Sequence, residues 1–146
     1  VLEYAVRRFL EVKLGTVSHD APQTACVNGQ MRGKNRTTCD FLLNGRRVEV
    51  KSTQLYWNKG RQNWVATWRN VKRNEYDDLY LALYTPTAVH VYKHDHATGV
   101  SSSGRDQHAS GGCVFAVAPR KMTDLDTAID AIASKLRPMH VATLRM

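Results

Sequence analysis

The sequence predicts one α/β domain in which β-strands lie between a helix near each end of the chain. Three observations lead to this fold. Residues 2–14 repeat apolar side chains at helical spacing, residues 38–93 contain several short runs of strand-forming residues, and residues 123–137 form a second apolar helix face. The 146 residues, 42% of them hydrophobic, suffice for one domain with its own core. The sequence contains no run of about 18 apolar residues, so neither a membrane span nor a membrane partner is expected.

The first element is a helix over residues 2–14, which Gly15 ends. On this helix Glu3 falls at the edge of the apolar stripe and is expected to face an interior site, whereas Glu11 is expected to point into water. The sequence starts with Val1 and already reads as helix there, which suggests a piece excised from a longer chain. The apolar stripe consists of Leu2, Ala5, Val6, Phe9 and Leu10.

A polar loop and a β-hairpin follow the helix. Residues 16–37 are rich in turn formers and predict a loop, with one short strand near Cys26. The segments Thr38–Leu43 and Arg47–Leu55 predict the two strands of the hairpin. Asn44-Gly45 between them is typical of a tight hairpin turn.

The rest of the chain predicts further strands and a second helix. Trp64–Val71 alternates like a strand, and the runs "LYLALYTP" and "AVHVYKH" predict two more strands joined at Pro86. Asp95–Gly112 is nearly devoid of apolar residues, so we expect a flexible loop or one that a partner orders. "CVFAVAP" predicts a last strand, and the helix after it has Thr123 as N-cap and ends at Pro138.

The three cysteines, Cys26, Cys39 and Cys113, are odd in number and show no CxxC spacing. A disulfide framework is therefore not expected, although one bridge plus a free thiol remains an alternative. This usage favours a reducing compartment, and we expect an intracellular protein of the cytoplasm or nucleus.

Positive charge is concentrated in residues 32–73. This tract holds eleven of the 21 Lys and Arg and only two acids, Asp40 and Glu49, so its net charge of +9 exceeds the +8 of the whole chain. Such a tract favours a polyanionic partner, above all a nucleic acid, and the alternative is a solvated basic face. Trp64 and Trp68, at alternate strand positions, are expected to pack in the core. The expected nucleic-acid-binding residues are Arg32, Lys34, Arg36, Arg46, Arg47, Trp57, Lys59, Arg61, Arg69, Lys72 and Arg73.

The spacing of the two acids in this tract is typical of a metal-binding catalytic site. Glu49 and Lys51 share one face of their predicted strand, and Asp40 lies across the hairpin, where its carboxylate can approach Glu49. Two adjacent carboxylates repel each other unless a cation lies between them, and Mg²⁺ favours such oxygens together with phosphate oxygens. The alternative is an exposed salt bridge between Glu49 and Lys51, worth at most ~1 kcal/mol.

Asp40, eight intervening residues and then Glu49-Val50-Lys51 on a predicted hairpin resemble the PD-(D/E)XK nuclease superfamily. The resemblance extends in element order over about residues 1–95, and no particular branch is identified. It implies a restriction endonuclease-like core, with a mixed central β-sheet flanked by an N-terminal and a C-terminal helix. One departure is Cys39, which stands before Asp40 where the pattern has proline.

The resemblance also implies a metal site. Its ligands would be Asp40, Glu49 and the backbone carbonyl of Val50, and Glu3 matches an acid that some branches place on the first helix. The metal would be Mg²⁺, for which Mn²⁺ substitutes. Such an ion neutralises the phosphate and holds the attacking water.

The expected function is that of a Mg²⁺-dependent DNA endonuclease, which hydrolyses phosphodiester bonds by metal-activated water and leaves a 5′ phosphate. Lys51 resembles the catalytic lysine of the superfamily, and Gln54 resembles a glutamine that positions the scissile phosphate or a water in several branches. Because one active site cuts one strand, a homodimer acting on double-stranded or branched DNA is expected. Two alternatives stay open: a nucleic-acid-binding module of the same fold without catalysis, and a ribonuclease.

Overall fold

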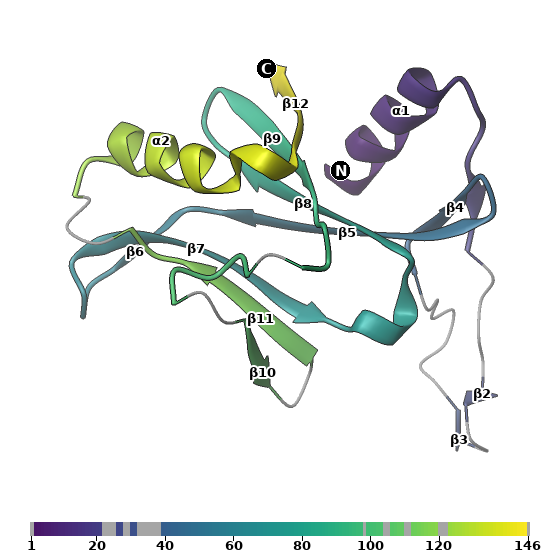
Figure 1. Cartoon of the computed structure of the whole chain (residues 1–146), viewed down its shortest axis with the longest axis horizontal. Coiled ribbons are helices and arrows are strands. Elements are labelled where there is room, and N and C mark those ends of the chain that lie inside the picture. Colours follow the sequence, from purple (N-terminus) through teal and green to yellow (C-terminus); the bar gives the residue numbers. More distant parts are fainter. Residues whose placement is uncertain are drawn as a thin grey trace. The chain divides into compact units, whose positions relative to one another are not determined.

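The computed structural model describes residues 2–21, 26–27, 30–31, 39–97, 99–103, 106–109, 112–119 and 123–145. These residues form a mixed α/β fold in which strands predominate (Figure 1). The chain divides into two compact units, the first comprising Val1–Val50 and Asn74–Leu79 and the second Lys51–Arg73 and Tyr80–Met146. No helix among the described residues is both long and apolar enough to cross a membrane.

The first unit contains one helix and the start of a β-sheet with strand order β1-β4-β5-β8. The pairs β1/β4 and β4/β5 are antiparallel, and so is the short pair β2/β3. Val6 and Leu10 of the helix are buried, as are Phe41 and Val48 of the sheet, and burying each such side chain contributes roughly 1.5–3 kcal/mol. The elements are α1 (Leu2–Leu14), β1 (His19–Asp20), β2 (Cys26–Val27), β3 (Gln30–Met31), β4 (Phe41–Leu43), β5 (Arg46–Gln54), η1 (Arg73–Glu75) and β8 (Asp78–Tyr84), of which β5, η1 and β8 continue into the second unit.

Helix α1 confirms the predicted range and its end at Gly15, whose φ is 63°. The prediction for Glu11 was wrong. Its Oε2 accepts hydrogen bonds from the backbone N–H of Ser18 at 2.9 Å and from the Ser18 hydroxyl at 3.0 Å. These two bonds, the backbone one first, hold the pKa of Glu11 below its ordinary value. Helical periodicity did not reveal this contact because Ser18 reaches the helix only after the chain turns back beyond Gly15.

The turn between β4 and β5 has the predicted form, since Asn44 and Gly45 have φ values of 52° and 76°. A positive φ at both central residues defines the type I′ hairpin turn, which matches the twist of the flanking strands. Strand β5 lies within one residue of its predicted bounds, whereas β4 is shorter than predicted because residues 39 and 40 form a bend before it.

Gly45→Ala should lower the free energy of unfolding by about 1–2 kcal/mol, because a Cβ is disfavoured at a left-handed φ. The matched control is Gly60→Ala. Gly60 has no positive φ, and an added Cβ would meet Asn58 Oδ1 at 3.4 Å, an ordinary contact distance. Urea denaturation of both variants measures the difference, and equal losses at the two positions would contradict the expected role of the turn.

The second unit contains a four-stranded antiparallel sheet, β10-β11-β7-β6, and the strands β8, β9 and β12 of the six-stranded sheet β1-β4-β5-β8-β9-β12. The pairs β8/β9 and β9/β12 are antiparallel. The predicted strands corresponding to β7, β8, β9 and β11 are confirmed. Strands β6 and β12 were not predicted, nor was β10, which lies in the segment expected to be a loop. The further elements are β6 (Tyr56–Asn58), β7 (Asn63–Val71), β9 (Ala88–Lys93), β10 (Gln107–Ala109), β11 (Gly112–Val117), α2 (Leu125–Leu136), η2 (Arg137–Met139) and β12 (His140–Arg145).

Helix α2 has the predicted range and apolar face, with Ala128, Ile132 and Leu136 buried. Its N-cap is Asp124 rather than the predicted Thr123. Asp124 Oδ2 accepts hydrogen bonds from the Thr127 backbone N–H and hydroxyl, both at 2.9 Å, and a carboxylate there also faces the positive end of the helix dipole.

Part of the segment expected to be a flexible loop is held by the chain itself. Val100 is fully buried. Asp106 Oδ1 accepts hydrogen bonds from the Ser101 backbone N–H at 2.9 Å and from the Ser101 hydroxyl at 2.8 Å. The Ser101 hydroxyl oxygen in turn accepts the N–H of Ala116 in β11 at 2.9 Å.

His94, which follows β9, should make the stability of the second unit dependent on pH. The residue is buried, and neither ring nitrogen has a hydrogen-bond partner among the described residues. Burial, more than the nearby His96, lowers the pKa of His94. The unfolded chain therefore binds the proton more tightly, and the stability should fall as the pH drops below about 6.5.

We expect His94→Leu to reduce the loss of stability between about pH 7.5 and pH 5.5, measured as the shift of the urea midpoint. Some dependence should remain, because burial also lowers the pKa of His90. The control is His19→Gln at an exposed position. A His94→Leu midpoint that shifts with pH as much as that of the wild type would contradict this account.

Candidate functional site

Asp40 is the best-positioned of the predicted site residues. It lies in the bend before β4, where its backbone N–H donates to the Val48 carbonyl at 3.0 Å. Its Oδ2 accepts the backbone N–H of Val50 at 2.7 Å, and its Oδ1 accepts no hydrogen bond from the described residues. The carboxylate is thus held against β5, beside the backbone that follows Glu49.

Strand β5 presents its backbone and side chains in a regular alternation. Val48 and Val50 are buried, whereas Glu49 is half-buried on the other face, as predicted. The Val48 carbonyl and the Val50 N–H both point toward Asp40. Because the N–H and C=O of one strand residue point to the same side, the Val50 carbonyl also faces the side of Asp40.

Glu3 lies close enough to Asp40 to be affected by its charge. Glu3 is exposed on α1 rather than facing an interior site as expected. Partial desolvation and then the negative charge of Asp40 raise the pKa of its carboxyl above its ordinary value. Among the described residues no group of three or more His, Cys, Asp or Glu is arranged to hold a metal ion. Lys51 is two residues after Glu49 in β5, and Gln54 is exposed at the end of that strand; both belong to the second unit.

Two arginines from the predicted nucleic-acid-binding set form ion pairs within the first unit. Arg46 contacts both carboxylate oxygens of Asp78, at 2.8 and 3.0 Å. Arg47 pairs with Asp77 at 3.1 Å, and its guanidinium and backbone N–H lower the pKa of that carboxyl. The sequence contained a signal for this pairing, since two adjacent arginines on one strand are matched by two adjacent acids at the start of another.

Seven of the nine remaining predicted nucleic-acid-binding residues fall into three groups. Arg32, Lys34 and Arg36 lie outside the described residues. Lys59, Lys72 and Arg73 are exposed, and Arg73 donates to the His96 carbonyl at 2.9 Å. Trp57 is half-buried and packs edge-to-face against Trp64 at 5.5 Å. Trp64 is also half-buried rather than in the core as expected, whereas Trp68 is in the core as predicted.

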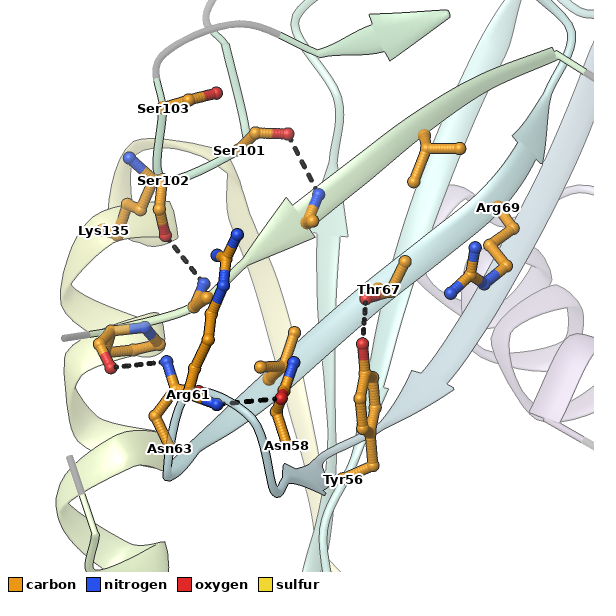
Figure 2. Close-up of a pocket in the computed structure, with 15 residues that line it drawn as sticks. Tyr56, Asn58, Arg61, Asn63, Thr67, Arg69, Ser101, Ser102, Ser103 and Lys135 are labelled. Atoms are coloured by element: carbon orange, nitrogen blue, oxygen red, sulfur yellow. Dashed lines mark hydrogen bonds between the residues drawn. The ribbon is translucent and has the colours of Figure 1, made fainter. Parts of the chain in front are cut away.

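Arg61 and Arg69 line a groove of about 1030 Å³ in the second unit, which Figure 2 shows. Its floor is one face of β6, β7 and β11, and its walls include Ser101, Ser102 and Ser103 and the side chain of Lys135 from α2. We call this the basic groove. Sequence reasoning missed Lys135 and the serines, because both segments are distant from β7 in the sequence.

Comparison of the chain with models of known protein families, with curated proteins and with solved structures found no match. The resemblance to the nuclease superfamily accordingly stays a prediction based on the residues of the hairpin.

Proposed function

We propose that the protein is a Mg²⁺-dependent endonuclease with a restriction endonuclease-like core, which hydrolyses DNA phosphodiester bonds by metal-activated water. The observation that carries this proposal is the 2.7 Å hydrogen bond from the Val50 N–H to Asp40 Oδ2. It fixes a carboxylate beside the Glu49-Val50 segment, where the sequence pattern requires one. The cysteine spacing favours a reducing compartment, so an intracellular location is part of this proposal.

The first unit offers oxygen atoms that suit a hard cation. Asp40 Oδ1, the Glu49 carboxylate and the Val50 carbonyl would hold Mg²⁺, and Glu3 would add a nearby negative charge. The raised pKa of Glu3 supports this assignment, since it reflects in part repulsion from Asp40 that a bound cation would relieve. When bound, Mg²⁺ supplies the positive charge that activates water and stabilises the charge developing on the phosphate.

Two residues of β5 would complete the chemistry. The Lys51 ammonium group would favour hydroxide over water at the attacking position and add positive charge near the phosphate. Gln54 would orient the phosphate or the water. Because one such site cuts one strand, cleavage of a duplex would require a homodimer.

Incubation with supercoiled, linear, branched and single-stranded DNA and with RNA, each with Mg²⁺, Mn²⁺ or EDTA, tests the proposal. Nicking of DNA that depends on the metal is the expected result, and cleavage of RNA alone would make the protein a ribonuclease. A protein that cuts none of these substrates but binds them would instead be a nucleic-acid-binding module, a second candidate that the cations of the basic groove favour.

A further inference from the structure

We propose that the basic groove binds single-stranded nucleic acid, with its phosphates on the three cations and a base or sugar donor on Asn63. This inference goes beyond the proposed cleavage. The groove belongs entirely to the second unit and uses neither Asp40 nor Glu49.

Strand alternation explains why the groove residues share one face. Along β7 the odd-numbered residues from Asn63 to Arg69 line the groove, as do Tyr56 and Asn58 of β6. The even-numbered residues of β7 point the other way, and Trp68 among them is fully buried. The sheet thus separates a packed face from a face that is open to a ligand.

The charged side chains that line the groove are all positive and are spread along its length. Arg61, Arg69 and Lys135 are exposed. Among the described residues no acidic side chain lines the groove, and none forms an ion pair with any of the three cations. Arg61 precedes β7 and Arg69 lies six residues beyond Asn63, a span of about 20 Å along an extended strand. Figure 2 shows the two arginines far apart in the groove. One phosphate cannot contact both, so the arrangement favours a ligand with several phosphates in a row.

Asn63 shows that this ligand also carries a hydrogen-bond donor. The residue is only 4% exposed, and its Nδ2 donates to the Pro119 carbonyl at 3.3 Å. That bond fixes the orientation of the amide, because the flipped amide would bring two acceptor oxygens together. The Oδ1 atom is buried without a hydrogen-bond partner among the described residues, an arrangement that costs free energy unless a donor binds there.

The need for a hydrogen-bond donor at Asn63 favours a single-stranded ligand over a duplex. Phosphodiester groups present acceptors only, whereas base amino groups and the ribose 2′-hydroxyl can donate. In a duplex the base donors lie in the grooves or are engaged in pairing, but a single strand can turn a base toward the protein. A single-stranded ligand therefore supplies both the phosphates and the donor.

Tyr56 and Ser102 fit the same ligand. Tyr56 is 41% exposed, and its hydroxyl is 3.2 Å from the Thr67 hydroxyl. This contact holds the ring in place as a stacking surface for a base. On the opposite wall the Ser102 hydroxyl oxygen accepts the Ala118 N–H at 2.7 Å. The Ser102 hydroxyl hydrogen can then be donated to a phosphate oxygen.

The test is fluorescence anisotropy of the full chain with labelled DNA and RNA strands of about 12 nucleotides, in EDTA and across a salt series. Arg61→Gln, Arg69→Gln and Lys135→Gln should each weaken binding about five-fold and reduce the salt slope by about 0.7. The control Arg145→Gln removes an exposed cation of β12 that does not line the groove, and it should bind like the wild type. Tyr56→Ala should weaken binding roughly ten-fold, whereas Tyr56→Phe keeps the ring and should bind nearly as well as the wild type.

The outcomes separate this site from the proposed nuclease site. Asp40→Asn should bind the strands normally in EDTA, whether or not the protein cuts DNA.

Tighter binding of RNA than of DNA would assign the Asn63 partner to the 2′-hydroxyl, and equal binding would assign it to a base; both results support the groove. Three results would overturn it: groove variants that bind like Arg145→Gln, a duplex that binds as tightly with the same sensitivity to the variants, or tripolyphosphate that displaces the strand while Tyr56→Ala has no effect.

Discussion

Asp40→Asn should reduce metal-dependent DNA cleavage by about 10²–10³-fold or more while leaving the fold intact. The asparagine side chain retains an oxygen that can accept the Val50 N–H, so the bend before β4 keeps its 2.7 Å contact. What the substitution removes is the negative charge that would attract a divalent cation. Initial rates of plasmid nicking over a range of Mg²⁺ concentrations measure the effect, with urea denaturation as the check on folding.

The matched control is Asp20→Asn, which removes an exposed carboxylate from the same unit and breaks its ion pair with Arg7. It should leave cleavage unchanged. Glu49→Gln and Lys51→Ala should lose cleavage as Asp40→Asn does, and all three should still bind DNA. A nicking rate for Asp40→Asn equal to that of Asp20→Asn would show that this carboxylate does not hold the metal.

Trp68→Ala should lower the free energy of unfolding by about 3–5 kcal/mol, the largest stability loss that we expect for a single substitution. Trp68 is completely buried in β7, and its indole N–H donates to the Ala82 carbonyl of β8 at 3.2 Å. The residue therefore links the two sheets of the second unit through both packing and a hydrogen bond. Because a typical domain is stable by only about 5–15 kcal/mol, Trp68→Ala should leave a small margin at 25 °C.

Two further variants separate the contributions of Trp68. Trp68→Phe keeps most of the apolar volume but leaves the Ala82 carbonyl without its donor, which should cost about 1–3 kcal/mol. Trp57→Ala removes a half-buried indole that packs on the edge of Trp64, and it should cost less than Trp68→Ala. Urea denaturation gives all three values. Equal losses for Trp57→Ala and Trp68→Ala would contradict the distinction between the two tryptophans.

Helices and strands could be predicted wherever the periodic pattern of apolar side chains extends over enough residues to be detected. Helices α1 and α2 have apolar stripes, and β5 and β7 are long strands with clear alternation. Strand β6 was missed because only Leu55 separates it from β5, so the two form one continuous strand-like run. Strand β12 was missed because its residues are exposed or half-buried throughout, and no apolar alternation marks it.

The site residues could be predicted only where they lie close together in the sequence. Asp40 lies next to β5 because a two-residue turn sets the register of the hairpin, and that register can be read from the sequence. The basic groove depends on Ser102 and Lys135, which approach β7 only through tertiary packing. The aromatic residue that lines the groove is Tyr56 and not its neighbour Trp57, because neighbouring residues of a strand point to opposite faces.

Buried residues and groove-lining residues alternate along β7, and this alternation has a consequence for protein engineering. Ala66 and Trp68 are fully buried, whereas Thr67 and Arg69 between and beyond them belong to the groove. If the groove binds its proposed ligand, affinity and stability thus depend on alternating positions of a single strand. A library randomised at residues 67 and 69 should yield altered ligand preferences at little cost in thermal tolerance, while the same diversity at residues 66 and 68 should yield mostly insoluble protein.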